Sequence, residues 1–509
     1  MSIANKNKFS FTKAGVILLQ LTLIAKFLAF CRELAVAAYF GSSNDTDSFF
    51  IAYGLIANIL YGLATAFATT FLPLYVEERE NRGRVFANKF AGQSIVFFSS
   101  AAIAIAAVVF ALSGALTKII APSVPPAQAE QIALFIRILT AGLIFSLLNS
   151  FACSLLDAER IFGSTAISGI IYSAAVIASA VFFSKNYGIT SLIIAISGAN
   201  LLQFLFSGLR SCKYITLALP SKKDSRLWKM LLLAVPILLS NTTIEINQII
   251  NRSLAINLGK GIVSAFSYAS TLTVFVTSTL VYSLVTIFFT EFSKAACADN
   301  SLEKIRKLLQ NGLNILLIIL LPLTCITFIY AEDIVTIALM RGKFTAEDVV
   351  VTAQGLRWMA PGIFAIVVKA LFTKCFISMK NTLTPMIVSI CEVFLNIVLV
   401  ILLSKRFGIS GISAAMSTAN LCAAFALFIL LNKNIGGAIL KYSLGYILKS
   451  TISTVCAITL LCVLRLQLGT IVPFCRLTLA TAAGFASFAL LYWHFFKHWH
   501  KRSELSPKN

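Results

Sequence analysis

The chain has 509 residues, of which 58% are hydrophobic and only 12% are charged. A soluble domain carries about 25% charged residues, so this composition excludes a soluble protein and indicates an integral membrane protein. The formal net charge is +22. The basic residues lie mostly in short connections between hydrophobic segments, which is typical of membrane topology rather than of nucleic-acid binding.

Hydrophobic stretches of about 20 residues recur along the chain, and each is long enough to span a bilayer as a helix. The first begins near residue 14 and carries charges without a small-residue cleavage pattern, so we interpret it as a retained helix rather than a signal peptide. We predict an all-α polytopic membrane protein with about 14 transmembrane helices. The expected spans are 14–40, 47–73, 86–112, 131–156, 162–183, 188–209, 230–251, 262–290, 311–330, 349–377, 383–403, 408–431, 442–464 and 474–496.

The distribution of basic residues predicts which side each connection faces. With a cytoplasmic N-terminus, 25 lysines and arginines fall in inner connections and ten, Arg252 among them, in outer connections. This asymmetry favours the count of spans and places both termini in the cytoplasm. Within the outer connection 331–348, apolar and charged residues alternate as in a short interfacial helix.

A short sequence pattern occurs twice in the chain, at a spacing of about 220 residues, as in an internal repeat. Arg32-Glu-Leu-Ala followed by Gly41 resembles Arg252-Ser-Leu-Ala followed by Gly259. Chance similarity between apolar helices is the alternative. A true repeat predicts two pseudo-symmetric six-helix lobes related by a pseudo-two-fold axis, with a binding site at their interface. The expected parts are an N-terminal lobe (1–210), a basic cytoplasmic linker (211–229), a C-terminal lobe (230–431), and two appended helices with a basic tail (432–509).

The first expected helix carries three charges, Lys26, Arg32 and Glu33. Lys26 and Glu33 are seven positions apart and therefore share one helix face. One interpretation is a local Lys26–Glu33 pair, with Arg32 reaching an interface. We favour a cationic wall in which Glu33 holds the arginine, because a guanidinium matches phosphate oxygens bidentately. Charges at this depth cost about 2.5–3.5 kcal/mol each, so they indicate a cavity or a partner.

Three further charged residues are candidates for function. Asp47 begins the second helix, where it caps that helix, pairs with Arg32 or binds a cation. Glu245 lies among hydrogen-bonding neighbours, which favours ion coupling or a polar contact between helices. Lys369 has the same two interpretations, ion coupling or a polar contact between helices. Snorkelling to the membrane surface is the default interpretation for Lys369 and for the remaining charges in the spans. Those remaining charges are Arg137, Arg357, Lys374, Glu392 and Lys449.

The sequence gives no support for enzymatic or metal chemistry. All three histidines lie in Tyr492-Trp-His-Phe-Phe-Lys-His-Trp-His500, where an aromatic belt with positive anchors explains them better than a metal site does. The eleven cysteines include no C-x-x-C pair. Walker-type glycine loops and nucleophile elbows do not occur either. We therefore expect no catalysis, no bound metal and no cofactor, and leave open a coupling ion, Na⁺ or H⁺.

Eight blocks of sequence form a recognisable set along the chain. They are Lys26-Phe-Leu-Ala-Phe-Cys-Arg-Glu-Leu-Ala-Val-Ala-Ala-Tyr-Phe-Gly41, Thr46-Asp-Ser-Phe-Phe-Ile-Ala, Pro236-Ile-Leu-Leu-Ser, Ser267-Tyr-Ala, Arg341-Gly-Lys-Phe-Thr-Ala-Glu-Asp, Pro361-Gly, Val368-Lys and Asn381-Thr-Leu-Thr-Pro. Together these blocks resemble the MurJ/MviN family of lipid II flippases, within the multidrug/oligosaccharidyl-lipid/polysaccharide exporter superfamily. The resemblance implies a fourteen-helix, two-lobe, V-shaped transporter that flips an undecaprenyl-pyrophosphate-linked saccharide. It also implies that Lys26, Arg32 and Asp47 match cavity residues of the family.

The chain departs from the family pattern at three basic positions. Leu60-Tyr61 and Ser270-Thr271 stand where the family places arginines, and Gly54 stands where it places a basic residue. We therefore expect a less cationic cavity than in a typical lipid II flippase.

We predict a lipid II flippase of the bacterial cytoplasmic membrane that moves its substrate from the inner to the outer leaflet by alternating access. The expected partners are the lipid-linked saccharide pyrophosphate, the bilayer and cell-envelope synthesis proteins, with no nucleic acid. An exopolysaccharide or O-antigen carrier flippase of the same fold is the first alternative. A cation-coupled drug antiporter and a non-transporting scaffold are the others.

Overall fold

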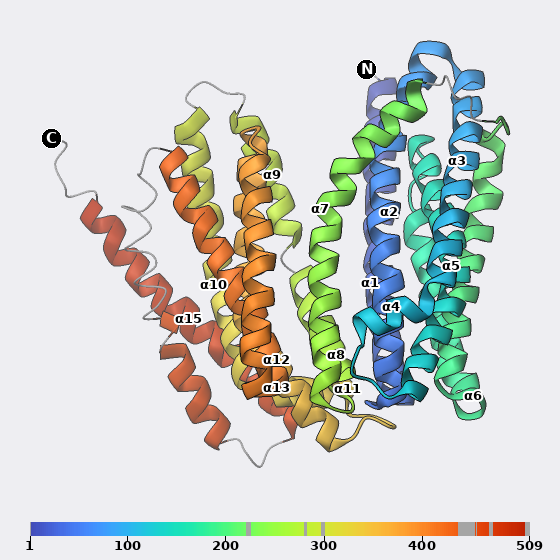
Figure 1. Cartoon of the computed structure of the whole chain (residues 1–509). Helices are drawn as coiled ribbons and strands as arrows, with labels where there is room; N and C mark the ends of the chain where they lie inside the picture. The colour runs from blue at the N-terminus through green and yellow to red at the C-terminus, as the bar shows by residue number, and fades with distance from the viewer. Residues whose placement is uncertain are drawn as a thin grey trace. The chain divides into compact units, whose positions relative to one another are not determined.

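The computed structural model describes residues 2–219, 225–278, 282–296, 301–435, 453–454, 456–467 and 472–503. These residues are almost entirely α-helical, and none of them forms a strand (Figure 1). The expected all-α fold is confirmed. The expected span 442–464 lies largely outside the described residues.

Contacts divide the chain into two units. Unit 1 comprises Met1–Ser264 and Arg341–Phe344, and unit 2 comprises Ala265–Met340 and Thr345–Asn509. The elements up to residue 258 are α1 (Ser2–Phe40), α2 (Asn44–Arg82), α3 (Arg84–Ala111), α4 (Ser113–Ile120), α5 (Pro126–Ala158), α6 (Ser164–Ser211), the 3₁₀ helix η1 (Cys212–Tyr214), α7 (Ser225–Ala255) and the 3₁₀ helix η2 (Ile256–Leu258). The later elements are α8 (Ile262–Val276), α9 (Tyr282–Ala296), α10 (Ser301–Ile329), α11 (Ala331–Leu339), α12 (Ala346–Ser378), α13 (Leu383–Asn434) and α15 (Pro473–Ser503).

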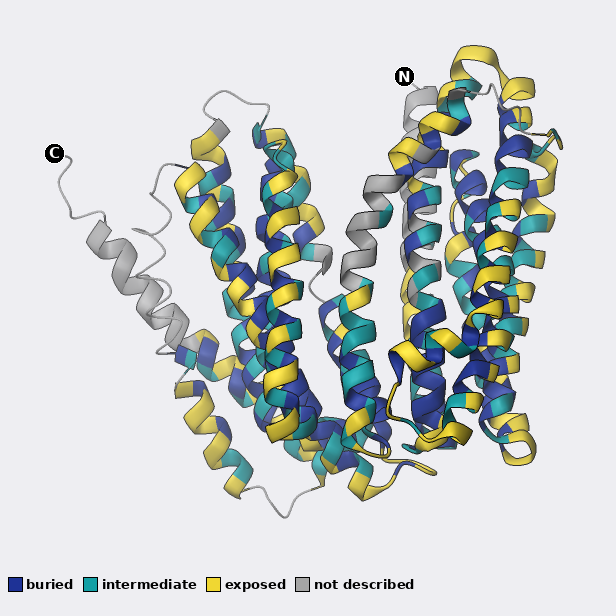
Figure 2. Cartoon of the chain, in the orientation of Figure 1, coloured by how far each residue is buried: buried dark blue, intermediate teal, exposed yellow. Residues whose placement is uncertain are grey.

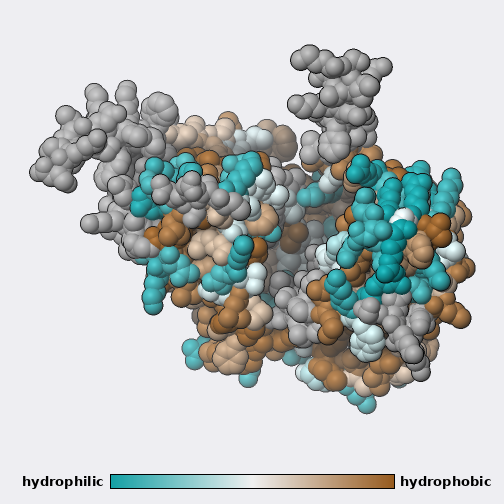
Figure 3. All heavy atoms as spheres, turned by 90° about the horizontal axis from the view of Figure 1, so that it is seen from above, coloured by the Kyte–Doolittle hydropathy of each residue, from teal (hydrophilic) through white to brown (hydrophobic). Residues whose placement is uncertain are grey.

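Seven of the described helices are long and apolar enough to cross a bilayer: α2, α3, α5, α6, α10, α12 and α13. Exposed residues follow the outer sides of the helices (Figure 2), and many are large hydrophobics such as Phe182 and Phe394. Seen from above, hydrophilic side chains gather on this end, while hydrophobic ones predominate along the rim (Figure 3). Apolar side chains left exposed on this scale are those that face lipid in a membrane protein.

Two glycines turn single hydrophobic runs into pairs of spans. α6 breaks at Gly188 (φ 55°, ψ −145°) and α13 breaks at Gly408 (φ 56°, ψ −133°). A positive φ is strained for residues with a Cβ, so glycine lets the chain reverse here without a loop. The four expected spans 162–183, 188–209, 383–403 and 408–431 therefore fit into two elements.

The separation in sequence between Gly188 and Gly408, which we call the repeat offset, recurs at other landmarks. Shifting α5 along the chain by the repeat offset makes it coincide with α12 at both ends. Arg160 (φ 61°) and Lys380 (φ 62°), the non-glycine residues with positive φ among those described, differ by the same offset. The internal repeat is confirmed. The counterpart of Gly41 in the second copy is Gly261 rather than Gly259. The φ angle is 65° at Gly41 and 79° at Gly261.

The repeat also explains α4, a short helix that we did not expect. The sequence predicts an interfacial helix within 331–348, and α11 (Ala331–Leu339) lies there. Shifted back by the repeat offset, α11 overlaps α4 (Ser113–Ile120), which is also a short helix. The sequence pattern that predicts this short helix is therefore recognisable in α11, the copy of α4 in the second half of the chain.

The start of α2 is fixed by a capping box. Ser43 Oγ accepts the backbone N–H of Thr46 (3.3 Å), and Thr46 Oγ1 accepts the N–H of Ser43 (2.6 Å). These bonds satisfy backbone groups that a helix end leaves unpaired. They also leave the neighbouring Asp47 available for another helix.

A short segment from late in the chain completes unit 1 at the end of α1. The backbone N–H of Lys343 donates to Ala38 O (2.8 Å). A Cβ at Gly342 would lie 2.2 Å from Ala38 O, and a Cβ at Gly41 would lie 2.6 Å from Lys343 O. Only glycine permits these approaches. Two blocks that carry the family resemblance therefore lie against each other.

Packing places α7 in unit 1, where it lies against α2. The segment before α7 also lies on unit 1, because the N–H of Thr216 donates to Asn88 O (3.0 Å). By its place in the repeat, α7 begins the second copy, so the repeat boundary and the unit boundary differ. The expected lobe and linker limits stay a prediction.

Candidate functional site

The guanidinium of Arg32 is held from two sides within unit 1. Its Nη2 lies 2.6 Å and its Nε 3.2 Å from Glu33 Oε1. Its Cζ lies 5.1 Å from the centre of the Tyr172 ring on α6. A carboxylate and an aromatic face both stabilise a partly buried cation. Glu33 therefore orients Arg32, and the alternative Lys26–Glu33 pair is absent among the ion pairs of the described residues.

Lys26 is exposed and lines a cavity of about 690 Å³ in unit 1. Asp157 and Thr165 line the same cavity. The lysine therefore faces open space less than two helical turns before Arg32 along α1. This position suits a cation that meets a soluble or lipid-borne anion.

A second cavity of about 700 Å³ also has Asp157 and Thr165 in its wall. Tyr53 of α2 and Glu245 of α7 line this second cavity. Tyr53 also lines a third, smaller cavity of about 180 Å³, together with Tyr172, the ring beneath Arg32. Shared wall residues thus connect the three cavities, from Lys26 to the ring partner of Arg32.

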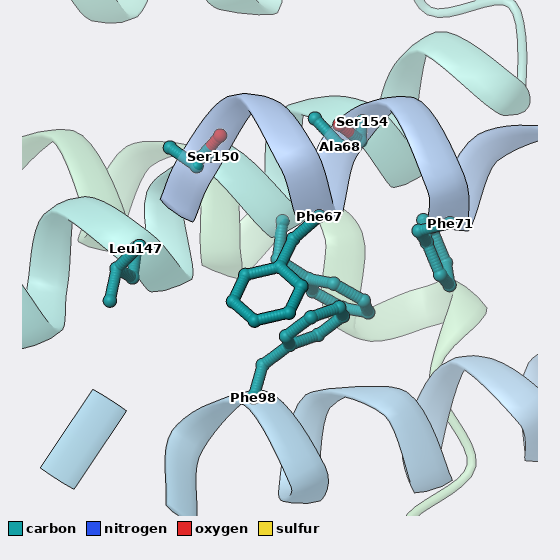
Figure 4. Close-up of a pocket in the computed structure, with 9 residues that line it drawn as sticks. Phe67, Ala68, Phe71, Phe98, Leu147, Ser150 and Ser154 are labelled. Carbon is teal, nitrogen blue, oxygen red and sulfur yellow. The ribbon is translucent and has the colours of Figure 1, made fainter. Parts of the chain in front are cut away.

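An aromatic pocket adjoins the second cavity. Figure 4 shows Phe67, Phe71 and Phe98 gathered at this place, with Ser150 and Ser154 on the other side. Ser150 and Ser154 line both spaces. The polar cavity and the aromatic pocket therefore lie side by side with two serines between them, an arrangement that suits a ligand with polar and apolar parts.

Asp47 has a role that the sequence did not predict. Its Oδ2 accepts the backbone N–H of Gly261 (2.6 Å), and its Oδ1 accepts the backbone N–H (2.8 Å) and Oγ (2.6 Å) of Ser264. Asp47 therefore caps a helix, but that helix is α8 rather than its own. A carboxylate at a helix N-terminus is stabilising. Both carboxylate oxygens are thus engaged by the start of α8, and the expected substrate-binding role of Asp47 stays a prediction.

Arg252 is the residue that sequence reasoning missed. We expected it in an outer connection, but α7 extends to Ala255 and includes it. Its guanidinium lies against Gly54 of α2, where an added Cβ would be 1.8 Å from Nη1. The repeat was the available signal, because Arg252 is the copy of Arg32 at the repeat offset. Glu245, on the same face of α7, is one of the acidic groups whose charge reaches Arg252.

Lys369 does not snorkel; it makes a polar contact between helices of unit 2. Its Nζ lies 2.7 and 2.8 Å from the two carboxylate oxygens of Glu392 and 2.8 Å from Asn420 Oδ1. Glu392 precedes the break in α13 and Asn420 follows it. One ammonium therefore joins α12 to both halves of α13.

The copies of these three residues lie in unit 1. Shifted back by the repeat offset, Lys369, Glu392 and Asn420 fall on Asn149, Tyr172 and Asn200. Those three residues line the cavities near Arg32. The same positions therefore surround open space in unit 1 and are joined by an ion pair in unit 2.

Among the described residues, no cluster of three or more His, Cys, Asp or Glu side chains could hold a metal ion. Lys26, Asp157 and Glu245 are the charged residues in the walls of the three cavities. Arg32 lies beside them over the ring of Tyr172, and guanidinium groups are suited to an anion that carries several oxygens.

A comparison with protein families decides the family. The family model for the lipid II flippase MurJ matches residues 36–501. The chain belongs to this family. The match includes α2, α6 and the whole of α7, which together supply Tyr53, Tyr172 and Arg252. The MurJ/MviN resemblance is confirmed, and the protein is a polytopic membrane transporter by family.

Curated relatives of the family are similar over most of their length. A probable lipid II flippase MurJ from Buchnera aphidicola subsp. Acyrthosiphon pisum is 28% identical over 405 residues, which cover 78% of this chain and 79% of the relative. The lipid II flippase MurJ of Burkholderia cenocepacia is 27% identical over 392 residues, covering 72% of this chain and 73% of the relative.

Solved structures show the same fold. A lipid II flippase MurJ in an inward closed conformation has a TM-score of 0.80 at 19% identity and covers 95% of this chain and 99% of its own. An inward-facing multidrug resistance transporter of the MATE family has a TM-score of 0.71 at 15% identity and covers 84% of this chain and 99% of its own. The helices of this chain therefore adopt the fold of these two structures.

Proposed function

We propose that the protein flips an undecaprenyl-pyrophosphate-linked saccharide, lipid II, from the inner to the outer leaflet of the bacterial cytoplasmic membrane. The observation that carries the proposal is Arg32, which Glu33 and Tyr172 hold beside cavities in unit 1. A buried arginine is costly in a membrane unless it serves a ligand or a partner. The names of the family and of its relatives support lipid II as that ligand.

The polar wall of the cavity of about 700 Å³ supports a ligand with a charged, sugar-bearing head. In our proposal, Arg32 and Lys26 bind the diphosphate, and Glu33 positions Arg32. Alternating access then carries the head group across while the lipid tail stays in the bilayer. Both chain termini face the cytoplasm in this scheme, as the basic connections predict.

Two rival ligand classes are less well supported. A drug antiporter for organic cations is consistent with the acidic Asp157 and Glu245 of the cavity wall, but it leaves the basic Arg32 and Lys26 without a role. An exopolysaccharide or O-antigen carrier shares the diphosphate, so only the glycan separates it from lipid II. Glu245 lines the cavity of about 700 Å³, and we propose it as the group that meets a coupling Na⁺ or H⁺.

Complementation tests the proposal directly. The gene is expressed in a bacterial strain depleted of its own lipid II flippase, and membrane insertion is checked by immunoblot. We expect growth to resume, and lipid II to become accessible to a lipid II-cleaving enzyme added outside spheroplasts. Failure of both readouts at normal expression and insertion would overturn lipid II as the substrate. Growth of a strain that lacks an O-antigen flippase instead would favour that alternative.

A further inference from the structure

Two nitrogens of Arg252 have no hydrogen-bond partner in the part of the chain that the structure describes. Nε and Nη1 are buried, and neither has an acceptor among the described residues. Buried donors without an acceptor cost free energy, and more so when they carry charge. A buried arginine is retained in a membrane segment where a ligand or a second charge supplies the missing acceptor.

Gly54 provides the space that the guanidinium occupies. A Cβ at this position would lie 1.8 Å from Nη1, 2.9 Å from Cζ and 3.3 Å from Cδ of Arg252. Gly54 has a helical backbone, so conformation does not require glycine there. A glycine inside a helix is destabilising relative to alanine. The absence of a side chain at Gly54 is therefore explained by the room that Arg252 needs.

Arg252 and Arg32 share the same neighbours. Tyr53 and Glu33 interact electrostatically with both arginines, and Glu245 interacts with Arg252. Glu33 is already bonded to Arg32 through both Nε and Nη2. Tyr53 lines the two cavities of about 180 and 700 Å³. The two guanidiniums are therefore neighbours of one tyrosine at the cavity wall.

We propose that Arg252 is a second phosphate-binding arginine, which α7 adds to the site of Arg32 through the gap left by Gly54. The proposal rests on the proposed function and assigns the two arginines to the two phosphates of the substrate. A diphosphate offers enough oxygens for two guanidiniums, and each pairs with phosphate in a charge-assisted manner. The unpaired nitrogens of Arg252 then gain their acceptors when the ligand binds.

Lipid binding to the full-length protein in nanodiscs tests the assignment. The probes are undecaprenyl diphosphate and undecaprenyl monophosphate, and binding is measured by native mass spectrometry. We expect Arg252→Gln to weaken diphosphate binding about tenfold, as for one lost charge-assisted bond. Monophosphate binding should weaken less, because Arg32 alone can hold a single phosphate. Loss of Arg252 with no change in diphosphate affinity would overturn the inference.

Gly54 offers a variant that leaves Arg252 in place. Gly54→Ala should displace the guanidinium and reduce diphosphate binding as Arg252→Gln does. Gly62→Ala is the matched control on the same helix, because nothing lies within 4 Å of a Cβ there. Equal binding by the two alanine variants would contradict the steric role of Gly54.

A relocated charge separates binding from folding. The double variant Gly54→Arg with Arg252→Ala returns an arginine to the same space from α2, and it should recover diphosphate binding relative to Arg252→Ala alone. No recovery, with normal melting temperature, would show that Arg252 acts through α7 only and would overturn the phosphate role. If the wild-type protein bound no diphosphate lipid at all, the proposed function itself would fail.

Discussion

The ammonium of Lys369 lies 2.7 and 2.8 Å from the two carboxylate oxygens of Glu392, in a membrane-embedded part of unit 2. Asn420 adds a third acceptor at 2.8 Å. All three donor positions of the lysine are thereby used. The pair is thus a fixed link between α12 and α13 rather than a pair of groups that reach for water.

Removing one partner of this pair should be costly. Lys369→Met leaves the Glu392 carboxylate buried without its cation, which typically costs about 3–5 kcal/mol. We expect a clear fall in melting temperature in detergent, and a partial recovery in Lys369→Met with Glu392→Gln. Lys374→Met is the control on α12, because Lys374 makes a ring contact with Phe289 at 4.8 Å instead of a buried ion pair. A double variant as unstable as the single one would contradict this account.

Asp47 should matter for stability rather than for substrate affinity. Asp47→Ala removes its hydrogen bonds to the first turn of α8, and bonds to a charged group contribute about 1.5–3 kcal/mol each. We expect a loss of several kcal/mol of unfolding free energy, seen as a lower melting temperature. Asp45→Ala is the control, since Asp45 is exposed and accepts a hydrogen bond from Gln131 (2.8 Å).

A second measurement compares diphosphate lipid binding by Asp47→Asn with binding by the wild-type protein. The amide keeps one acceptor for α8, so the variant should remain folded enough to measure. Affinity within about twofold of the wild type is expected, which corresponds to about 0.4 kcal/mol. A strong loss of affinity at unchanged stability would return Asp47 to the substrate site.

Arg32→Ala should abolish transport while the protein stays folded in the membrane. Arg32→Lys keeps the charge but loses the planar fork, so partial activity is expected. Complementation and membrane levels are the measurements. Arg137→Ala serves as the control, because Arg137 donates to Ser113 (2.8 Å) and lies over the ring of Phe110 rather than over the cavity-lining ring of Tyr172. Full activity of Arg32→Ala would refute the diphosphate site.

Lys26 should be replaceable by another cation but not by an anion. Its side chain faces a cavity of about 690 Å³ whose wall also contains Asp157. Lys26→Arg is therefore expected to complement, whereas Lys26→Glu adds a second negative charge and should not. Growth assays at matched expression decide the point. Equal activity of the two variants would show that the charge at this position is incidental.

The fold was largely predictable because a bilayer imposes a simple pattern on sequence. Hydrophobic runs of similar length marked the helices, and the turns at Gly188 and Gly408 fell at the boundaries of expected spans. The helix α4 could not be recognised by itself, because it is short and has no distinctive charge pattern. Only its copy α11 carried the signal.

The candidate site was predictable in part. Arg32 and Glu33 stand next to each other in the chain, so their pairing follows from local geometry. The contacts of Asp47 with Gly261 and Ser264 join segments far apart in the sequence, which no local pattern encodes. The sequence places Arg252 in an outer connection just after the expected span 230–251, whereas α7 continues past it to Ala255. That error left Arg252 out of the candidate site, although its guanidinium lies against Gly54 of α2.

The constant register between the halves has a consequence for how the chain diverged. Since pairs from Arg32 and Arg252 to Asn200 and Asn420 all keep one offset, no net insertion or deletion separates the two copies over this stretch. The halves parted by substitution, and each residue of one half has an identifiable counterpart in the other. The protein thus contains its own reference sequence, in which the exchange of Asn149 for Lys369 records how one ancestral position came to serve two different environments.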